Sequence, residues 1–193
     1  MKDTLLVVFF IIFLAVPPFR HIVCDVFRQC RRKASITTEV QFMNINTYNI
    51  RFTNDRIGQL VKEETFAYST DETVIDSPEK AAKLIEALWD GSKLAQEHFW
   101  LLALDGARKV SGAFTVTIGT LVSSLVHPRE VFQRAILAGA ASIIIAHNHP
   151  SGMLDISEND KEVTKRIRQA GNILGIRLDD HIIVADGNFV SAS

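Results

Sequence analysis

Four stretches of the chain have the apolar and β-branched composition of buried strands: residues 99–104, 110–118, 142–146 and 181–185. The turn pair Asp105-Gly106 separates the first two stretches and predicts that they pair in antiparallel fashion. Residues 142–146 have the strongest β composition, which predicts an inner strand of a sheet. Asp186-Gly187-Asn188 follows the last stretch and predicts a hairpin that returns through Phe189-Val190.

Helix-start signals precede two segments that have the spacing of amphipathic helices. Ser77-Pro78-Glu79 supplies a hydroxyl N-cap, a proline at the first helical position and an acid in the first turn, and Gly91 is expected to close this helix. Pro128-Arg129-Glu130 opens the second helix, which is expected to end near Gly139. The apolar side chains expected to share its buried face are Val131, Ala135 and Ile136.

A third helix is predicted for residues 158–174, with Gly175 as its cap. The stripe expected to face the core consists of Val163, Ile167, Ala170 and Leu174. Since helices and strands alternate along residues 76–193, the sequence predicts an α/β domain with three layers, in which helices cover both faces of a mixed central sheet. Residues 43–75 contain short strand-like stretches and predict a small β-rich arm ahead of that domain.

Residues 1–42 form an apolar N-terminal segment and a linker, for which three interpretations remain open. Residues 4–19 carry no charge, but the apolar run is shorter than the about 20 residues of a membrane-spanning helix, and it ends at Pro17-Pro18. If the run inserted as an anchor, the bases that follow it would stay in the cytoplasm. A signal peptide has an apolar core of this length, but no small-residue cleavage site follows at once. The third interpretation is translation from Met43, which leaves the segment outside the working protein.

The charge and the cysteines narrow the classes of partner and compartment. The 193 residues carry a formal net charge of -1 at pH 7, so no large field of one sign attracts nucleic acid or anionic lipid. Cys24 and Cys30 lie outside the predicted domain and have no second pair at zinc-knuckle spacing. We therefore expect free thiols and a cytoplasmic protein, with a membrane anchor through residues 4–19 as the alternative.

Two histidines and one aspartate carry the candidate chemistry of the chain. His147 and His149 follow the predicted inner strand, and side chains two apart on extended backbone point to one side, so both imidazoles can reach one ion. Ser157-Glu158-Asn159-Asp160 begins the third helix as a capping-box-like sequence, which places the Asp160 carboxylate in the first turn. Two nitrogens and one carboxylate suit Zn²⁺, and three protein ligands leave a fourth position for a water that attacks a carbonyl.

Each of these residues also has a purely structural interpretation. The two histidines can be solvated residues at a strand end, and Asp160 can be only an acid that favours the helix dipole. The conjunction of a His-x-His pair, a Pro-Ser-Gly turn and a serine-capped helix favours a catalytic site with one Zn²⁺ per chain.

The segment His147-Asn148-His149-Pro150-Ser151-Gly152, followed by Ser157 and Asp160, resembles the JAMM signature of JAB/MPN metalloproteases, in the form found in bacterial RadC-like proteins. Residues 120–122, 126–132 and 178–184 are also similar to that family, so the resemblance covers residues 76–193. It implies a JAB/MPN, cytidine-deaminase-like architecture and a zinc ion held by His147, His149 and Asp160.

The resemblance also implies two catalytic side chains. The general base of JAB/MPN enzymes is a glutamate just before the first central strand, and Glu97 in Gln96-Glu97-His98-Phe99 matches that place. Ser157 matches the residue that helps to hold the oxyanion, a role that can coexist with an N-cap. His127 and His181 lie in family-like segments and are expected to pack or to support the ligands rather than to bind the metal.

Two departures from the family pattern concern the substrate. The residues ahead of the domain show no helix-hairpin-helix pair, and Met153-Leu154-Asp155-Ile156 replaces a loop that usually contains proline. We therefore expect a zinc-dependent metalloprotease or isopeptidase that acts on a peptide or protein, and we do not expect a nucleic-acid partner. The alternatives are a RadC-like, DNA-repair-associated accessory protein without proteolytic activity and a membrane-tethered hydrolase. The sequence indicates neither the substrate nor the oligomeric state.

Overall fold

The structure, a computed structural model, describes residues 42–69, 74–119 and 126–192. Its elements in chain order are β1 (Phe42–Phe52), β2 (Gly58–Ser69), α3 (Pro78–Trp89), the 3₁₀ turn η2 (Gly91–Lys93), β3 (His98–Leu104), β4 (Val110–Ile118), α4 (Pro128–Leu137), β5 (Ser142–Asn148), α5 (Glu158–Leu174), β6 (Arg177–Ala185) and β7 (Asn188–Ser191). The predictions for the apolar run, the linker and the two cysteines lie outside the described residues, as do residues 120–122. Within the described ranges, no helix combines the length and the apolar composition needed to span a bilayer.

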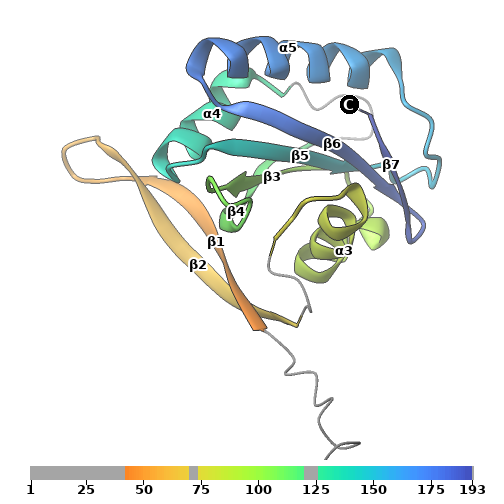
Figure 1. Ribbon diagram of the computed structural model, residues 1–193, viewed down its shortest axis with the longest axis horizontal. Coiled ribbons are helices and arrows are strands. Elements are labelled where there is room, and N and C mark those ends of the chain that lie inside the picture. Colours follow the sequence, from red (N-terminus) through yellow and green to blue (C-terminus); the bar gives the residue numbers. More distant parts are fainter. Residues whose placement is uncertain (1–41, 70–73, 120–125, 193) are drawn as a thin grey trace, which may run out of the picture. The chain divides into compact units, whose positions relative to one another are not determined.

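The strands of the described residues form one mixed sheet in the order β2-β1-β4-β3-β5-β6-β7. Strands β1 and β4 pair in parallel, as do β5 and β6, while the other neighbours are antiparallel. Helix α3 covers one face of the sheet, and α4 and α5 cover the other (Figure 1). The predicted three-layer α/β domain is therefore confirmed, and β5 lies at an inner position between β3 and β6.

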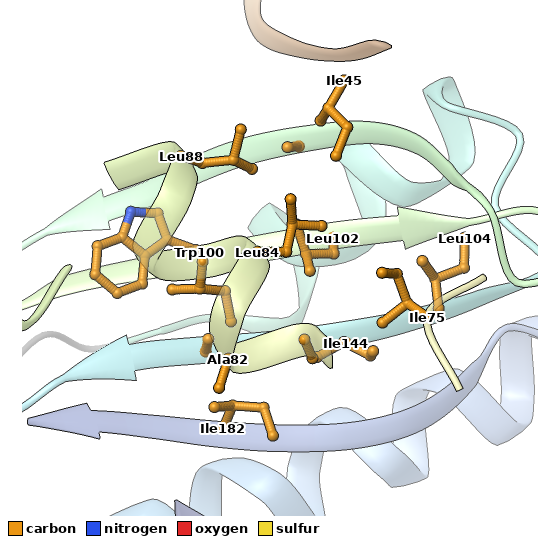
Figure 2. Close-up of a cluster of buried hydrophobic side chains, with 14 of the residues drawn as sticks. Ile45, Ile75, Ala82, Leu84, Leu88, Trp100, Leu102, Leu104, Ile144 and Ile182 are labelled. Carbon is orange, nitrogen blue, oxygen red and sulfur yellow. The ribbon is translucent and has the colours of Figure 1, made fainter. Parts of the chain in front are cut away.

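The alternation of side chains along β3 and β5 builds a separate core on each face of the sheet. The core on the α3 face includes Leu84 and Leu88 of the helix, Trp100 and Leu102 of β3, and Ile144 of β5 (Figure 2). The core on the α5 face includes Leu101 of β3, Phe132 of α4, Ile145 of β5 and Ile167 of α5. Because both faces are covered, the inner strands are apolar at almost every position, and each such side chain contributes about 1.5–3 kcal/mol when fully buried.

Helix α3 begins where its sequence predicts and ends by a different device. The Ser77 hydroxyl accepts a hydrogen bond from the Lys80 N–H at 3.4 Å, as an N-cap does. The prediction that Gly91 closes the helix is wrong, because Asp90 is the C-cap: it takes the left-handed conformation, and its N–H donates to the Glu86 carbonyl. Gly91 is required for packing instead, since a Cβ there would lie 2.8 Å from a ring atom of Trp100.

Helix α4 buries a slightly different face from the predicted one. Val131 and Ala135 are buried as expected, and Phe132 completes the face. The prediction for Ile136 is wrong, because this side chain is 56% exposed. An α-helix turns by roughly 100° per residue, so Ile136, five residues after Val131, is rotated by roughly 500° from it. This places the Ile136 side chain about 140° away from the direction of Val131, outside the buried face.

Helix α5 has the predicted bounds and the predicted left-handed Gly175 cap. Val163 and Ile167 are buried, but Leu174 is 47% exposed, so the predicted stripe ends one turn early. Gly171 occupies the contact instead, where an added Cβ would lie 2.3 Å from the Ile176 carbonyl oxygen. The close approach of α5 to the start of β6 therefore needs a residue without a side chain.

The segment ahead of α3 is one long hairpin of β1 and β2 rather than a set of short strands. Ile45 of β1 is buried in the α3-face core, and β1 joins the sheet through a parallel pair between Thr47 and Ala113 of β4. The alternating burial along β1 shows that one side of the hairpin is used for packing.

Candidate metal centre

The two predicted histidine ligands lie side by side at the end of β5. The last residue of β5 is Asn148, and the His149 N–H continues the extended path by donating to the Val184 carbonyl of β6 at 3.0 Å. Both imidazoles therefore point to the α5 face, with their Nε2 atoms 3.0 Å apart. His147 is 2% exposed, so one of the two rings lies almost entirely inside the protein.

The first turn of α5 brings the predicted carboxylate to the same point. Ser157 and Asp160 form a capping box, in which the Ser157 Oγ accepts from the Asp160 N–H and the Asp160 carboxylate accepts from the Ser157 N–H. This double contact fixes the carboxylate against the helix start. Its Oδ1 lies 3.2 Å from His147 Nε2, and its Oδ2 lies 3.8 Å from His149 Nε2.

The spacing of these three candidate ligands fits a tetrahedral metal ion. One ligand atom from each of His147, His149 and Asp160 can be chosen so that all lie within 4.8 Å of one another. Ligands about 2.0–2.1 Å from a tetrahedral Zn²⁺ stand roughly 3.3 Å apart, close to the separations between these side chains. The group can therefore hold a metal ion, and three protein ligands leave one position of a tetrahedron open.

Outer hydrogen bonds select the ring nitrogen that each histidine turns toward the centre. Thr164 Oγ1 donates to the Asp160 carbonyl at 2.6 Å, so it must accept from His181 Nδ1, also at 2.6 Å. His181 Nε2 is then the acceptor for His147 Nδ1 at 2.9 Å. In a neutral His147 this leaves the lone pair on Nε2, which faces the centre.

The second ligand is oriented by the main chain of the loop that follows it. His149 Nδ1 donates to the Met153 carbonyl at 2.8 Å, because a carbonyl can only accept. The lone pair of a neutral His149 therefore also lies on Nε2. Two lone pairs 3.0 Å apart repel one another unless a cation lies between them, which is the arrangement expected of metal ligands.

The charge states of the buried groups match this arrangement. Burial alone would raise the pKa of the Asp160 carboxyl, but the close contact with His147 and the hydrogen bonds donated by Ser157 outweigh it and hold the pKa below its ordinary value. Burial, together with repulsion from His147, lowers the pKa of His181 to about 3. Near neutral pH the centre thus contains an ionised carboxylate and a neutral supporting histidine.

Glu97 lies beside the histidine pair, at the start of β3. Its main-chain carbonyl accepts from the Gly119 N–H at 2.8 Å, and the next residue but one, Phe99, stacks on the His147 ring with centroids 6.0 Å apart. An open pocket of about 380 Å³ is lined by Glu97, His149, Pro150, Ser151, Met153 and Asp155. The predicted base and one predicted ligand therefore share a surface pocket.

A larger pocket of about 660 Å³ between the β1–β2 hairpin and the end of α3 contains none of the predicted site residues.

The other residues singled out in the sequence have structural partners. The Ser157 hydroxyl donates to Asp160 Oδ2 at 2.6 Å, so it is engaged with the carboxylate of the metal centre. His127 caps α4 through Nδ1, which accepts from the Arg129 N–H at 3.2 Å. His181 is fully buried and supports His147 as described above.

Two contributors to this centre are not predicted from the sequence. Thr164 follows Asp160 by four residues, so helical spacing places it on the same side, but its contact with His181 depends on how α5 packs on β6. Asn148 lies between the two histidines and holds the segment that carries Glu97. Its side chain is 1% exposed, and only strand alternation, which turns it away from its neighbours, marks it in the sequence.

Comparison with known proteins finds a matching family model and similar sequences. A family model described as the RadC-like JAB domain matches residues 75–193, more than half of the chain. A UPF0758 protein of Shouchella clausii is 49% identical over 135 residues, UPF0758 protein YsxA of Bacillus subtilis is 47% identical over 136, and a UPF0758 protein of Rubrobacter xylanophilus is 44% identical over 131. These matches cover 70%, 70% and 68% of this chain and 56%, 55% and 57% of the relatives. The chain therefore spans little more than half the length of these relatives.

Proposed function

Because this chain belongs to the RadC-like JAB domain family, we propose that it is a zinc-dependent metalloprotease or isopeptidase that hydrolyses an amide bond of a peptide or protein. The observation that carries the proposal is the convergence of His147, His149 and Asp160, whose ligand atoms meet with the spacing of a tetrahedral site. Two oriented imidazoles and one carboxylate are the donor set that suits Zn²⁺ with an open position.

When bound, zinc supplies a Lewis acid that lowers the pKa of water to about 7 and polarises the carbonyl of an amide. The rest of the chemistry belongs to side chains of the chain. Glu97 lines the pocket next to His149, where its carboxylate acts as the general base that takes a proton from the attacking water and passes it to the leaving amine. His181 and Thr164 hold His147 in the tautomer whose Nε2 lone pair faces the centre.

Ser157 is the proposed donor to the oxyanion that develops on the amide carbonyl. Its Oγ is fixed by the Asp160 N–H at 3.1 Å, while its own proton points to Asp160 Oδ2. A metal ion held by the Asp160 carboxylate would weaken this hydrogen bond, and the hydroxyl proton could then turn toward a substrate oxygen. A donor of this kind typically contributes about 10²–10³ to the rate.

The test is a cleavage assay on the full chain with a peptide library as the substrate. The chain loaded with one equivalent of zinc is compared with the chelator-treated chain and with zinc-loaded Glu97→Gln, and new peptide ends are identified by mass spectrometry. We expect cleavage by the zinc-loaded chain only, and a loss of about 10²–10⁴ in rate for Glu97→Gln at unchanged zinc content. Stoichiometric zinc without cleavage of any peptide, or equal cleavage by Glu97→Gln, would overturn the proposal.

Ser157→Ala is examined in the same assay beside Ser77→Ala. Both changes remove a serine N-cap, which costs about 1 kcal/mol of stability. Only Ser157→Ala is expected to slow cleavage, by about 10²–10³. Equal rates for the two variants would restrict Ser157 to its role in the helix cap.

A further inference from the structure

Asn148 lies between the two histidines of the metal centre, yet its side chain serves the opposite face of the sheet. His147 and His149 point toward α5, and alternation along the strand sends the Asn148 side chain to the α3 face, on the side of Ile144 and Ala146. This side chain is 1% exposed. A buried amide needs partners for its donors and its acceptor, because leaving them without hydrogen bonds costs about 1–3 kcal/mol.

The partners of Asn148 all belong to the segment that leads into β3. Its Oδ1 accepts from the His98 N–H at 2.7 Å, and its Nδ2 donates to the Gln96 carbonyl at 3.0 Å and to the Leu94 carbonyl at 3.3 Å. The ladder between β3 and β5 ends at the pair Phe99 and His147, so the Asn148 side chain takes over where main-chain pairing stops. Only one orientation of the amide satisfies one N–H donor and two carbonyl acceptors.

Glu97 lies between two of the groups that Asn148 holds. Its neighbours Gln96 and His98 are both bonded to Asn148, and its own carbonyl accepts from the Gly119 N–H. Within the described part of the chain, the Glu97 carboxylate has no hydrogen bond or ion pair of its own. The path of its main chain therefore determines the point from which the Glu97 side chain extends into the pocket.

We propose that Asn148 is a positioning residue, which fixes the main-chain path of residues 94–98 and so sets the distance between the Glu97 carboxylate and the metal centre. This inference rests on the proposed function, because it treats Glu97 as the general base. Three consecutive residues then divide the work: the outer two hold the metal, and the middle one holds the base. A displacement of about 1 Å at such a group can cost 10²-fold in rate.

The test compares Asn148→Ala with Ser142→Ala, which removes a buried polar side chain from the opposite end of the same strand. We expect Asn148→Ala to speed amide exchange at His98 by at least about 10-fold and to lower kcat by about 10–100-fold, with KM and zinc affinity nearly unchanged. Ser142→Ala should change neither the amide exchange at His98 nor kcat, KM or the zinc affinity. If Asn148→Ala fails to fold, Asn148→Ser keeps one hydroxyl and is expected to show the same pattern at smaller size.

A double-mutant cycle connects the effect to the base. Since Asn148 acts through Glu97, adding Asn148→Ala to Glu97→Gln should lower kcat by less than about 2-fold further. An equal loss in both backgrounds, an unchanged exchange rate at His98, or a loss of zinc affinity as large as the loss of kcat would each overturn the inference. If the unmodified chain binds zinc and cleaves nothing, the proposed function fails, while the exchange data still decide whether Asn148 holds residues 94–98.

Discussion

The central sheet buries polar side chains on both faces, and the two faces satisfy them differently. On the α3 face, the Asn148 amide has hydrogen bonds to one main-chain N–H and two main-chain carbonyls. On the α5 face, the lone pairs of His147 and His149 point at one another and at the Asp160 carboxylate. The first group is satisfied by the folded chain alone, whereas the second has the geometry to be satisfied by a bound cation.

This difference indicates which buried polar groups are structural and which form a binding site. Buried polar atoms normally have partners within the protein, since a group without one destabilises the fold. The cluster of His147, His149 and Asp160 departs from that rule, because its acceptor atoms face one another while the far sides of the two rings have hydrogen bonds to the protein. Changes to the polar cluster on the α5 face should therefore alter metal binding first, and changes to the apolar core on the α3 face should alter stability first.

The largest expected effect is that of His149→Ala. Because one of three protein ligands is lost, zinc affinity should fall by about 10³-fold, which is about 4 kcal/mol. Competition with a chromogenic chelator measures the affinity, and the zinc-dependent rise in melting temperature should disappear in parallel. His98→Ala is the control, because this histidine stacks on Trp100 outside the ligand group. Equal affinities of the two variants would remove the assignment of the α5 face as the metal site.

The next effect is that of Leu84→Ala on the α3 face, where the side chain is fully buried between α3 and the sheet (Figure 2). The free energy of unfolding should fall by about 2–5 kcal/mol, as measured by urea denaturation of the metal-free chain. Leu84→Met keeps the volume and should cost less than about 1.5 kcal/mol. Zinc affinity relative to the folded protein should stay within about 2-fold for both, and a larger change would show that the two faces are coupled.

The smallest of the three effects is that of Thr164→Val on the α5 face. The change keeps the shape of the side chain but removes the hydroxyl that accepts from His181 Nδ1, so the tautomer of His147 is no longer selected. Zinc affinity should fall by about 10–100-fold, the range typical for outer partners of a ligating histidine. Thr164→Ser restores the hydroxyl and should recover most of the affinity. If Thr164→Val binds zinc as tightly as the unmodified chain, the chain of contacts from Thr164 to His147 has no role in the centre.

Much of the fold follows from local signals in the sequence. Ser77 and Ser157 mark helix starts because their hydroxyls replace missing main-chain partners, and Gly175 marks a helix end because its φ is positive. The same logic failed for Gly91, whose small size is needed against Trp100 of another element. Contacts between elements distant in the sequence decide such positions, so a local pattern does not contain them.

The meeting of the three candidate ligands was predictable for a similar reason, whereas the residues that support them were not. His147 and His149 belong to one strand end and Asp160 to the next helix start, so short-range geometry predicts that they meet. The contact between His181 and Thr164 requires that β6 pair with β5 while α5 packs above them. Asn148 likewise depends on the pairing of β5 with β3.

The hydrogen bond from His149 to residue 153 has an evolutionary consequence. The acceptor is the main-chain carbonyl of Met153, while the Met153 side chain is 61% exposed in the pocket. Since every amino acid supplies the same carbonyl, residue 153 can be replaced without turning the imidazole. Sequence change can therefore remodel this wall of the pocket and leave the candidate metal centre intact.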